Sequence, residues 1–148
     1  TRSFTHVGPG QALSYAASSF AEQIARIEAG QAEPVLSVGN LEARRDLTDV
    51  RDTVRAYQLL MTGGLRATPY NVCSGRAFQI SEVLDGLLSN ASVEVSVRQD
   101  PSRTRPNDNP LLLGDRSRIT RDLGWSPEIP ISETLSDLLD YWRARIAR

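Results

Sequence analysis

The hydrophobic positions of the chain follow two alternating spacings, one typical of helices and one typical of strands, as in α/β proteins. Apolar residues three or four positions apart predict four longer helices, at residues 13–27, 50–61, 80–88 and 135–146. A shorter helix is predicted from Asp115, a suitable N-cap, to Gly124. Brief apolar or alternating runs predict strands at residues 2–6, 34–38, 70–72 and 93–97, the last of them half-buried.

The predicted strands are few and short, and the first lies at the start of the chain. We therefore expect an α/β fold with a small mixed sheet and about five helices. A chain of 148 residues, 40% of them hydrophobic, can bury one core, so a single domain is expected over residues 1–148. The small sheet and the start at Thr1 instead of Met suggest part of a larger enzyme, either processed or cut from a longer chain.

Composition excludes several classes of function. The net charge of −1 gives no general attraction to nucleic acid or to an anionic membrane. No apolar run approaches the ~20 residues that span a bilayer, and no signal peptide is visible. Cys73 is a lone cysteine, which excludes an internal disulfide and fits a reducing, cytoplasmic location. With only one histidine besides, no zinc site built by the protein is expected. The chain contains no lysine at all.

The segment GNLEARRDLTDVRD, residues 39–52, concentrates charge between a predicted strand and a predicted helix. Asp49 and Asp52 are expected in the first helical turn, where a carboxylate complements the helix dipole. Arg44 and Arg45 are expected just before that helix, where positive charge is mildly unfavourable. They either pair with the two aspartates or bind an anion, and the residues alone do not decide between these.

Two other segments carry candidate chemistry. In HVGPGQ, glycines permit a tight turn, which either connects two elements or lets a ligand approach the backbone. It lacks the third glycine and the βα context of a dinucleotide fingerprint. In RTRPND, the guanidinium groups of Arg103 and Arg105 suit phosphate, and the Asp108 carboxylate could accept hydrogen bonds from a nucleotide base. Alternatively, the three residues form a solvated loop with an internal ion pair. His6 and Cys73 are interpreted as structural, and Tyr15 as a residue on a helix face.

Six segments together resemble one family. They are RSFTHVGPGQ, FAEQIARIEAG, VGNLEARRDLTDVRDTVRAY, YNVCSG, RTRPNDNPLLLGD and LGWSPEIPISETLSDLLDYW. In this order they resemble the C-terminal, substrate-binding half of extended short-chain dehydrogenases/reductases that act on nucleotide sugars, the NAD-dependent epimerase/dehydratase family. The resemblance is greatest to the GDP-4-dehydro-6-deoxy-D-mannose reductases and GDP-mannose 4,6-dehydratases. It implies that the N-terminal Rossmann half, with its NAD(P) loop and Tyr-x-x-x-Lys pair, lies outside this chain.

The resemblance also implies roles for particular residues. Arg45 and Arg105 would contact the diphosphate or the nucleotide, and Asp108 would lie near the nucleoside. Phe20 and Ala21 belong to the helix that lines the nucleoside pocket. Thr5 departs from the pattern, because the family usually has a substrate-contacting asparagine at this position.

The sequence leaves three functions open. The first is the substrate-binding portion of a GDP-sugar reductase or dehydratase whose intact form transfers hydride at C4 of a GDP-hexose. The second is a truncated, non-catalytic binding module that self-associates through its exposed former domain interface. The third is half of a UDP-sugar epimerase, because LGWSP and the final helix are shared more widely. In each case the chain alone is expected to bind no NAD(P) and to be catalytically inactive.

Overall fold

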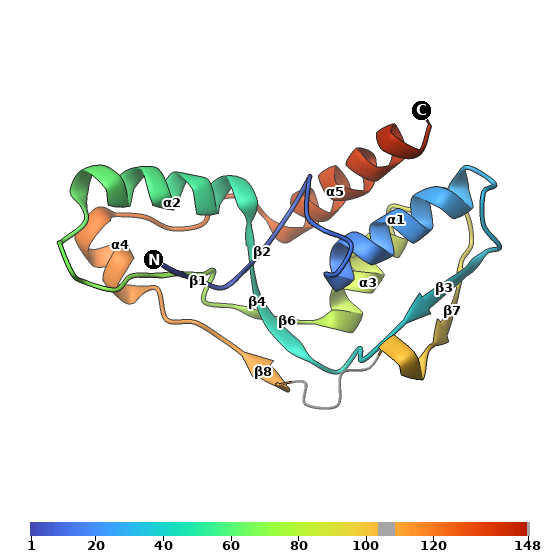
Figure 1. Ribbon diagram of the computed structural model, residues 1–148, viewed down its shortest axis with the longest axis horizontal. Coiled ribbons are helices and arrows are strands. Elements are labelled where there is room, and N and C mark those ends of the chain that lie inside the picture. The colour runs from blue at the N-terminus through green and yellow to red at the C-terminus, as the bar shows by residue number, and fades with distance from the viewer. Residues whose placement is uncertain (104–108, 148) are drawn as a thin grey trace.

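The computed structural model describes residues 1–103 and 109–147, which form five α-helices joined by short strands (Figure 1). The helices are α1 Ala16–Glu28, α2 Val50–Gly63, α3 Ile80–Leu88, α4 Ser117–Leu123 and α5 Ile131–Ile146. The strands are β1 Arg2–Ser3, β2 Thr5–Val7, β3 Val35–Val38, β4 Arg44–Asp49, β5 Asn71–Val72, β6 Ala77–Gln79, β7 Ser96–Gln99 and β8 Leu111–Leu112. A single 3₁₀ turn, η1, spans Pro101–Arg103.

Strand β4 is the centre of the sheet structure. It pairs in parallel with β2 and β8 and antiparallel with β6, whereas β1–β5 and β3–β7 form separate two-stranded parallel sheets. The expected α/β class with five helices and mixed strand pairing is confirmed. The strands divide among three small sheets, and none of them is longer than six residues.

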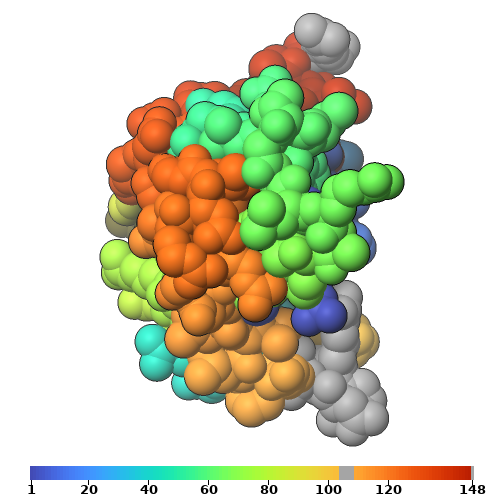
Figure 2. All heavy atoms as spheres, turned by 90° about the vertical axis from the view of Figure 1, so that its left-hand side faces the viewer, coloured from blue at the N-terminus to red at the C-terminus, as the bar shows by residue number. Residues whose placement is uncertain are grey.

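The buried apolar side chains form two clusters on either side of β4. The larger one lies among α1, α3 and α5, and includes Phe20, Ile24, Leu87 and Leu138. The smaller one surrounds Trp125, which is fully buried between α2 and α4. Figure 1 shows the two groups of helices at opposite ends of the molecule, and Figure 2 shows α2 and α4 side by side on one face.

The sequence interpretation was wrong about residues 44–49, which form a strand and not a loop that opens a helix. Three consecutive charged residues hid the strand pattern. Four hydrogen bonds from Ser74, Gly75 and Gly114 satisfy the buried Asp46 carboxylate, so tertiary partners make a strand possible here. The predicted strand at 93–97 is also displaced, since β7 begins at Ser96 and all four of its residues are exposed. Strands β6 and β8 were not predicted from the apolar pattern.

Helix α2 begins after Asp49, as predicted, and the aspartate side chain accepts from the amide of Arg51 at 2.7 Å. The aspartates do more than complement a dipole. Asp49 also accepts from the Thr134 hydroxyl at 2.7 Å, while Asp52 accepts from the amides of Glu128 and Ile129, each at 2.9 Å. The two carboxylates therefore tie α2 to α5 and to the segment that precedes it.

Candidate functional site

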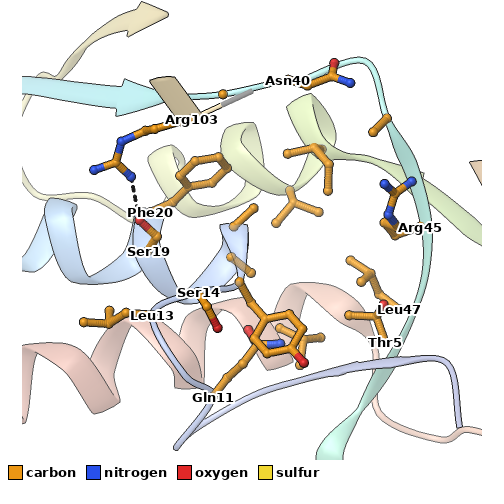
Figure 3. Close-up of a pocket in the computed structure, with 18 of the residues that line it drawn as sticks. Thr5, Gln11, Leu13, Ser14, Ser19, Phe20, Asn40, Arg45, Leu47 and Arg103 are labelled. Carbon is orange, nitrogen blue, oxygen red and sulfur yellow. Dashed lines mark hydrogen bonds between the residues drawn. The ribbon is translucent and has the colours of Figure 1, made fainter. Parts of the chain in front are cut away.

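The main cavity of about 770 Å³ opens between the start of α1, the strands β2 and β4, and the turn η1 (Figure 3). Its walls combine apolar side chains, among them Phe20 and Leu47, with two arginines, Arg45 and Arg103. Cavities of this size bind ligands of the dimensions of a nucleotide, with a few placed polar groups to orient them. Figure 3 places the two arginines on different sides of the space, so an anion could be approached from both.

Arg45 reaches the cavity because β4 directs alternate side chains to opposite faces. Arg45 and Leu47 line the cavity, whereas Asp46 is buried on the other face. The guanidinium Nη1 donates to the carbonyl oxygens of Arg44, at 2.9 Å, and of Asn109, at 2.6 Å. These main-chain bonds orient the guanidinium along the cavity wall.

Arg103 lies at the end of η1, and a close backbone contact holds it at the cavity. A Cβ placed on Gly39 would lie 2.5 Å from the Arg103 carbonyl oxygen, so only glycine permits this approach. The Asp100 carboxylate accepts from the amide and hydroxyl of Ser102, which closes the turn and lowers the pKa of Asp100. Arg103 Nη1 donates to the Ser19 hydroxyl at 3.2 Å, so its charge lies beside the first turn of α1.

The start of α1 adds a third favourable element for an anion. Tyr15, Ala16 and Ala17 line the cavity, and no acidic residue occupies the first turn of this helix. The first amides of a helix lack intrahelical acceptors and carry the positive end of its dipole. The helix is positioned by Ser18, whose hydroxyl donates to the carbonyl of Gln11 at 2.7 Å and accepts from the Trp142 indole at 3.0 Å.

A second cavity of about 660 Å³ adjoins the first. Both are lined by Thr5, Val7, Gln11, Tyr15 and Leu112, so they form two parts of one trough. Gln11 Nε2 donates to the His6 carbonyl at 2.7 Å, while its buried Oε1 has no hydrogen-bond partner among the described residues. An elongated ligand could therefore extend from the arginines past Gln11.

The structure brings Thr5, Phe20 and Arg45 to this cavity, together with Arg103, which the sequence analysis had marked as suited to phosphate. Ala21 is fully buried in the larger core cluster and does not line the cavity. Arg105 and Asp108 lie outside the described residues.

Sequence reasoning missed Gly39 and Tyr15 as cavity residues. Tyr15 immediately precedes α1 and is half-exposed, so its interpretation as a helix-face residue was wrong. No signal in the sequence marked Gly39, because its role depends on Arg103, a residue far along the chain. The motif HVGPGQ did mark Gln11, as part of a turn that a ligand could approach.

Asp49, Asp52 and Cys73 have structural surroundings that account for them. Asp49 forms an ion pair with Arg51 at 2.8 Å and Asp52 with Arg55 at 2.7 Å, so both aspartates have arginine partners on α2 itself. Burial raises the pKa of Asp49, but hydrogen bonds from Arg51 and Thr134 outweigh it and leave the pKa below its usual range. Burial, with a contribution from the nearby Asp46 charge, raises the pKa of the Cys73 thiol to about 11. Cys73 is therefore an inert buried residue, as expected.

Neither a membrane-crossing helix nor a metal-binding cluster occurs in the part of the chain that the structure describes. None of its helices is both long and apolar enough to cross a bilayer. Among residues 1–103 and 109–147, no three His, Cys, Asp or Glu side chains are grouped so that they could hold a metal ion.

Comparison with known proteins places this geometry in a family. The chain is 39% identical over 145 residues to GDP-6-deoxy-D-mannose reductase from Pseudomonas aeruginosa, covering 98% of this chain and 48% of that protein. The solved structure of RMD from Pseudomonas aeruginosa, complexed with NADPH, superposes with a TM-score of 0.91 at 38% identity, over 97% of this chain and 48% of that one. UDP-glucose 4-epimerase from Thermotoga maritima, solved with UDP-glucose, matches with a TM-score of 0.79 at 25% identity, over 98% and 45%.

The chain thus spans about half the length of the relatives it matches. A family model described as GDP-mannose 4,6 dehydratase matches residues 1–138, which is nearly the whole sequence. Together with the fold and the arginine-lined cavity, this match shows that the chain belongs to the GDP-mannose 4,6-dehydratase family of nucleotide-sugar enzymes.

Proposed function

We propose that residues 1–148 form a single nucleotide-sugar-binding domain, the substrate-binding portion of a GDP-sugar reductase or dehydratase. The observation that carries the proposal is the cavity of about 770 Å³ with Arg45 on β4, Arg103 on η1 and the start of α1 around it. Guanidinium groups and helix N-termini both favour phosphate oxygens. In this proposal the diphosphate lies between the arginines, Phe20 contributes to the nucleoside wall, and Thr5 contacts the part of the ligand that extends toward the second cavity.

The choice of GDP follows from the relatives. The matching family and the relative with 39% identity are both named for GDP-linked sugars. Arg105 and Asp108 belong to the proposal as further contacts to the nucleotide, on the family resemblance alone. The hexose chemistry at C4 would need a nicotinamide cofactor held outside this chain.

The chain alone is proposed to be catalytically inactive. It contains no lysine, so no Tyr-x-x-x-Lys pair can form within it. The glycines at positions 8 and 10 lie in a turn that precedes Tyr15 and α1, without the third glycine of a dinucleotide loop. NADPH oxidation by the pure chain in the presence of a GDP-4-keto-6-deoxy sugar would contradict this part of the proposal.

Calorimetric titration with GDP and with UDP tests the nucleotide assignment. We expect saturable GDP binding that weakens at least about tenfold, or about 1.4 kcal/mol, in Arg45→Ala and in Arg103→Ala. Arg121→Ala is the matched control, because it removes the same charge from a side chain that is 71% exposed and lines neither cavity. An equal loss of GDP affinity in all three variants would show that only the net charge of the chain matters, and would overturn the site.

Two other outcomes identify the alternative functions. Tighter binding of UDP than of GDP would assign the chain to the UDP-sugar epimerases, one of which superposes well. Absence of nucleotide binding, together with concentration-dependent dimers in analytical ultracentrifugation, would favour a non-catalytic module. The exposed run Leu111–Leu113 is the candidate contact for such self-association.

A further inference from the structure

We propose that Asp46 is a positioning residue for the nucleotide site, although it does not line the cavity. Its carboxylate holds β8 against β4, and β8 in turn sets the orientation of Arg45. This inference rests on the proposed function, since it concerns how the same cavity is held in its binding form.

Asp46 is 1% exposed, and backbone and hydroxyl donors surround its carboxylate. Oδ1 accepts from the amide and the hydroxyl of Ser74, both at 2.7 Å. Oδ2 accepts from the amides of Gly75 at 2.9 Å and Gly114 at 3.1 Å. Within the described residues no cationic side chain forms an ion pair with Asp46. Burying a carboxylate is costly, and these four hydrogen bonds offset that cost.

The bond to Gly114 fixes the end of β8. A Cβ on Gly114 would lie 2.5 Å from Cys73 Sγ and 2.9 Å from a ring carbon of Phe4, so the chain can come this close only as glycine. The other end of β8 is fixed by the Arg44 amide, which donates to the Pro110 carbonyl at 2.8 Å. In this register Arg45 lies opposite Leu112.

This register determines where the main chain meets Arg45. Asn109, which precedes β8, presents its carbonyl oxygen to Arg45 Nη1 at 2.6 Å. Leu112 of the same strand forms part of the wall of both cavities. Loss of the Asp46 contacts would therefore release one support of the Arg45 guanidinium and one wall of the trough together, without removing any group that touches the ligand.

A matched aspartate separates positioning from stability. Asp52 is 2% exposed, and its carboxylate also accepts hydrogen bonds from two backbone amides, those of Glu128 and Ile129, but it lines neither cavity. Asp46→Asn and Asp52→Asn both replace one acceptor oxygen by a donor that cannot pair with an amide. Both variants should lower the free energy of unfolding, whereas only Asp46→Asn should alter the nucleotide site.

The experiment compares GDP affinity by calorimetry in the wild-type chain and the two variants, at a temperature where circular dichroism shows all three folded. We expect Asp46→Asn to weaken GDP binding about tenfold or more, and Asp52→Asn to change it less than about twofold. Hydrogen–deuterium exchange should increase over residues 109–114 in Asp46→Asn and over 126–130 in Asp52→Asn. Equal GDP affinities in the two variants would overturn the inference.

Milder variants cover the case in which Asp46→Asn does not fold. Ser74→Ala removes one hydroxyl donor from Asp46, and Thr134→Val removes the equivalent donor from the buried Asp49. The inference is supported if Ser74→Ala binds GDP about threefold more weakly than the wild-type chain while Thr134→Val binds it equally well. Equal GDP affinities in the two variants would overturn it. If the wild-type chain binds no GDP, the proposed function fails. The positioning of β8 has its own test: unchanged hydrogen–deuterium exchange over residues 109–114 in Asp46→Asn or Ser74→Ala would overturn it.

Discussion

Arg143 on α5 donates two parallel hydrogen bonds to Glu28 at the end of α1, from Nε to Oε2 and from Nη2 to Oε1, each 2.7 Å long. The same guanidinium donates to the Asn90 carbonyl, and the Ser92 amide donates to Glu28. One ion pair thus joins α1, α5 and the segment that follows α3. The side chain of Glu28 is only 9% exposed, so solvent screens the pair weakly.

Acid should weaken the protein through this pair. The hydrogen bond from Arg143 is the main reason that the pKa of Glu28 falls from 4.5 to about 2. A lowered pKa means that the stabilisation is fully present above pH 4.5 and is lost as the pH falls toward 2. We expect Glu28→Gln to reduce the free energy of unfolding by about 2 kcal/mol at pH 7 and to flatten its pH dependence in this window. Urea denaturation at several pH values measures both, and the exposed Glu94→Gln is the control.

Gly39 should be required for binding more than for folding. In Gly39→Ala the new methyl group would meet the Arg103 carbonyl oxygen at 2.5 Å, a backbone atom that can move only with η1. We expect Arg103 to be displaced and GDP affinity to fall about tenfold. In the control, Gly63→Ala, the methyl group meets only the end of the flexible Leu123 side chain, and affinity should be unchanged. Unaltered binding in Gly39→Ala would contradict the requirement for this close approach at the site.

Cys73 should resist alkylation until the protein unfolds. Its thiol is fully buried and its pKa is raised to about 11, so little thiolate exists at neutral pH. Iodoacetamide labelling followed by mass spectrometry should show slow modification that accelerates in denaturant. A cysteine introduced by Met61→Cys, at a position that is 87% exposed, should react at once and serves as an internal control. Rapid labelling of Cys73 in the native chain would contradict its burial.

Trp125 should dominate the stability of the smaller core cluster. It is fully buried, and its indole Nε1 donates to the carbonyl of Asp52 at 3.1 Å. We expect Trp125→Ala to lower the free energy of unfolding by about 4 kcal/mol, because a large cavity forms and that carbonyl loses its donor. Leu65→Ala, at a position that is 62% exposed, should change it by less than about 0.5 kcal/mol in the same denaturant titration.

The helices could be predicted because their apolar residues repeat on one face. Leu135, Leu138 and Leu139 are all buried in α5, as their spacing predicted. Asp115 was nearly correct as a cap: its carboxylate accepts from the Ser117 amide at 2.8 Å, although the helix itself begins at Ser117. In such segments local spacing and packing agree.

The strand β4 could not be predicted, because its stability depends on groups distant in sequence. Asp46 accepts hydrogen bonds from residues as far along the chain as Ser74 and Gly114, and Arg45 donates to the Asn109 carbonyl. The family resemblance located Arg45, Thr5 and Phe20 without any of this information. It did not find Gly39, because the steric requirement there comes from a backbone contact between distant segments.

The packing of α1 against α5 has a consequence for synthesis on the ribosome. These two helices form the most extensive contact in the fold, and more than a hundred residues separate them along the chain. Leu138 and Leu139 complete the same cluster as Ile24. Helix α1 therefore emerges long before its partner, and during that delay its apolar face is exposed to chaperones and to other nascent chains. The larger core can close only after α5 has left the exit tunnel, so folding of this region is expected to wait for the synthesis of α5.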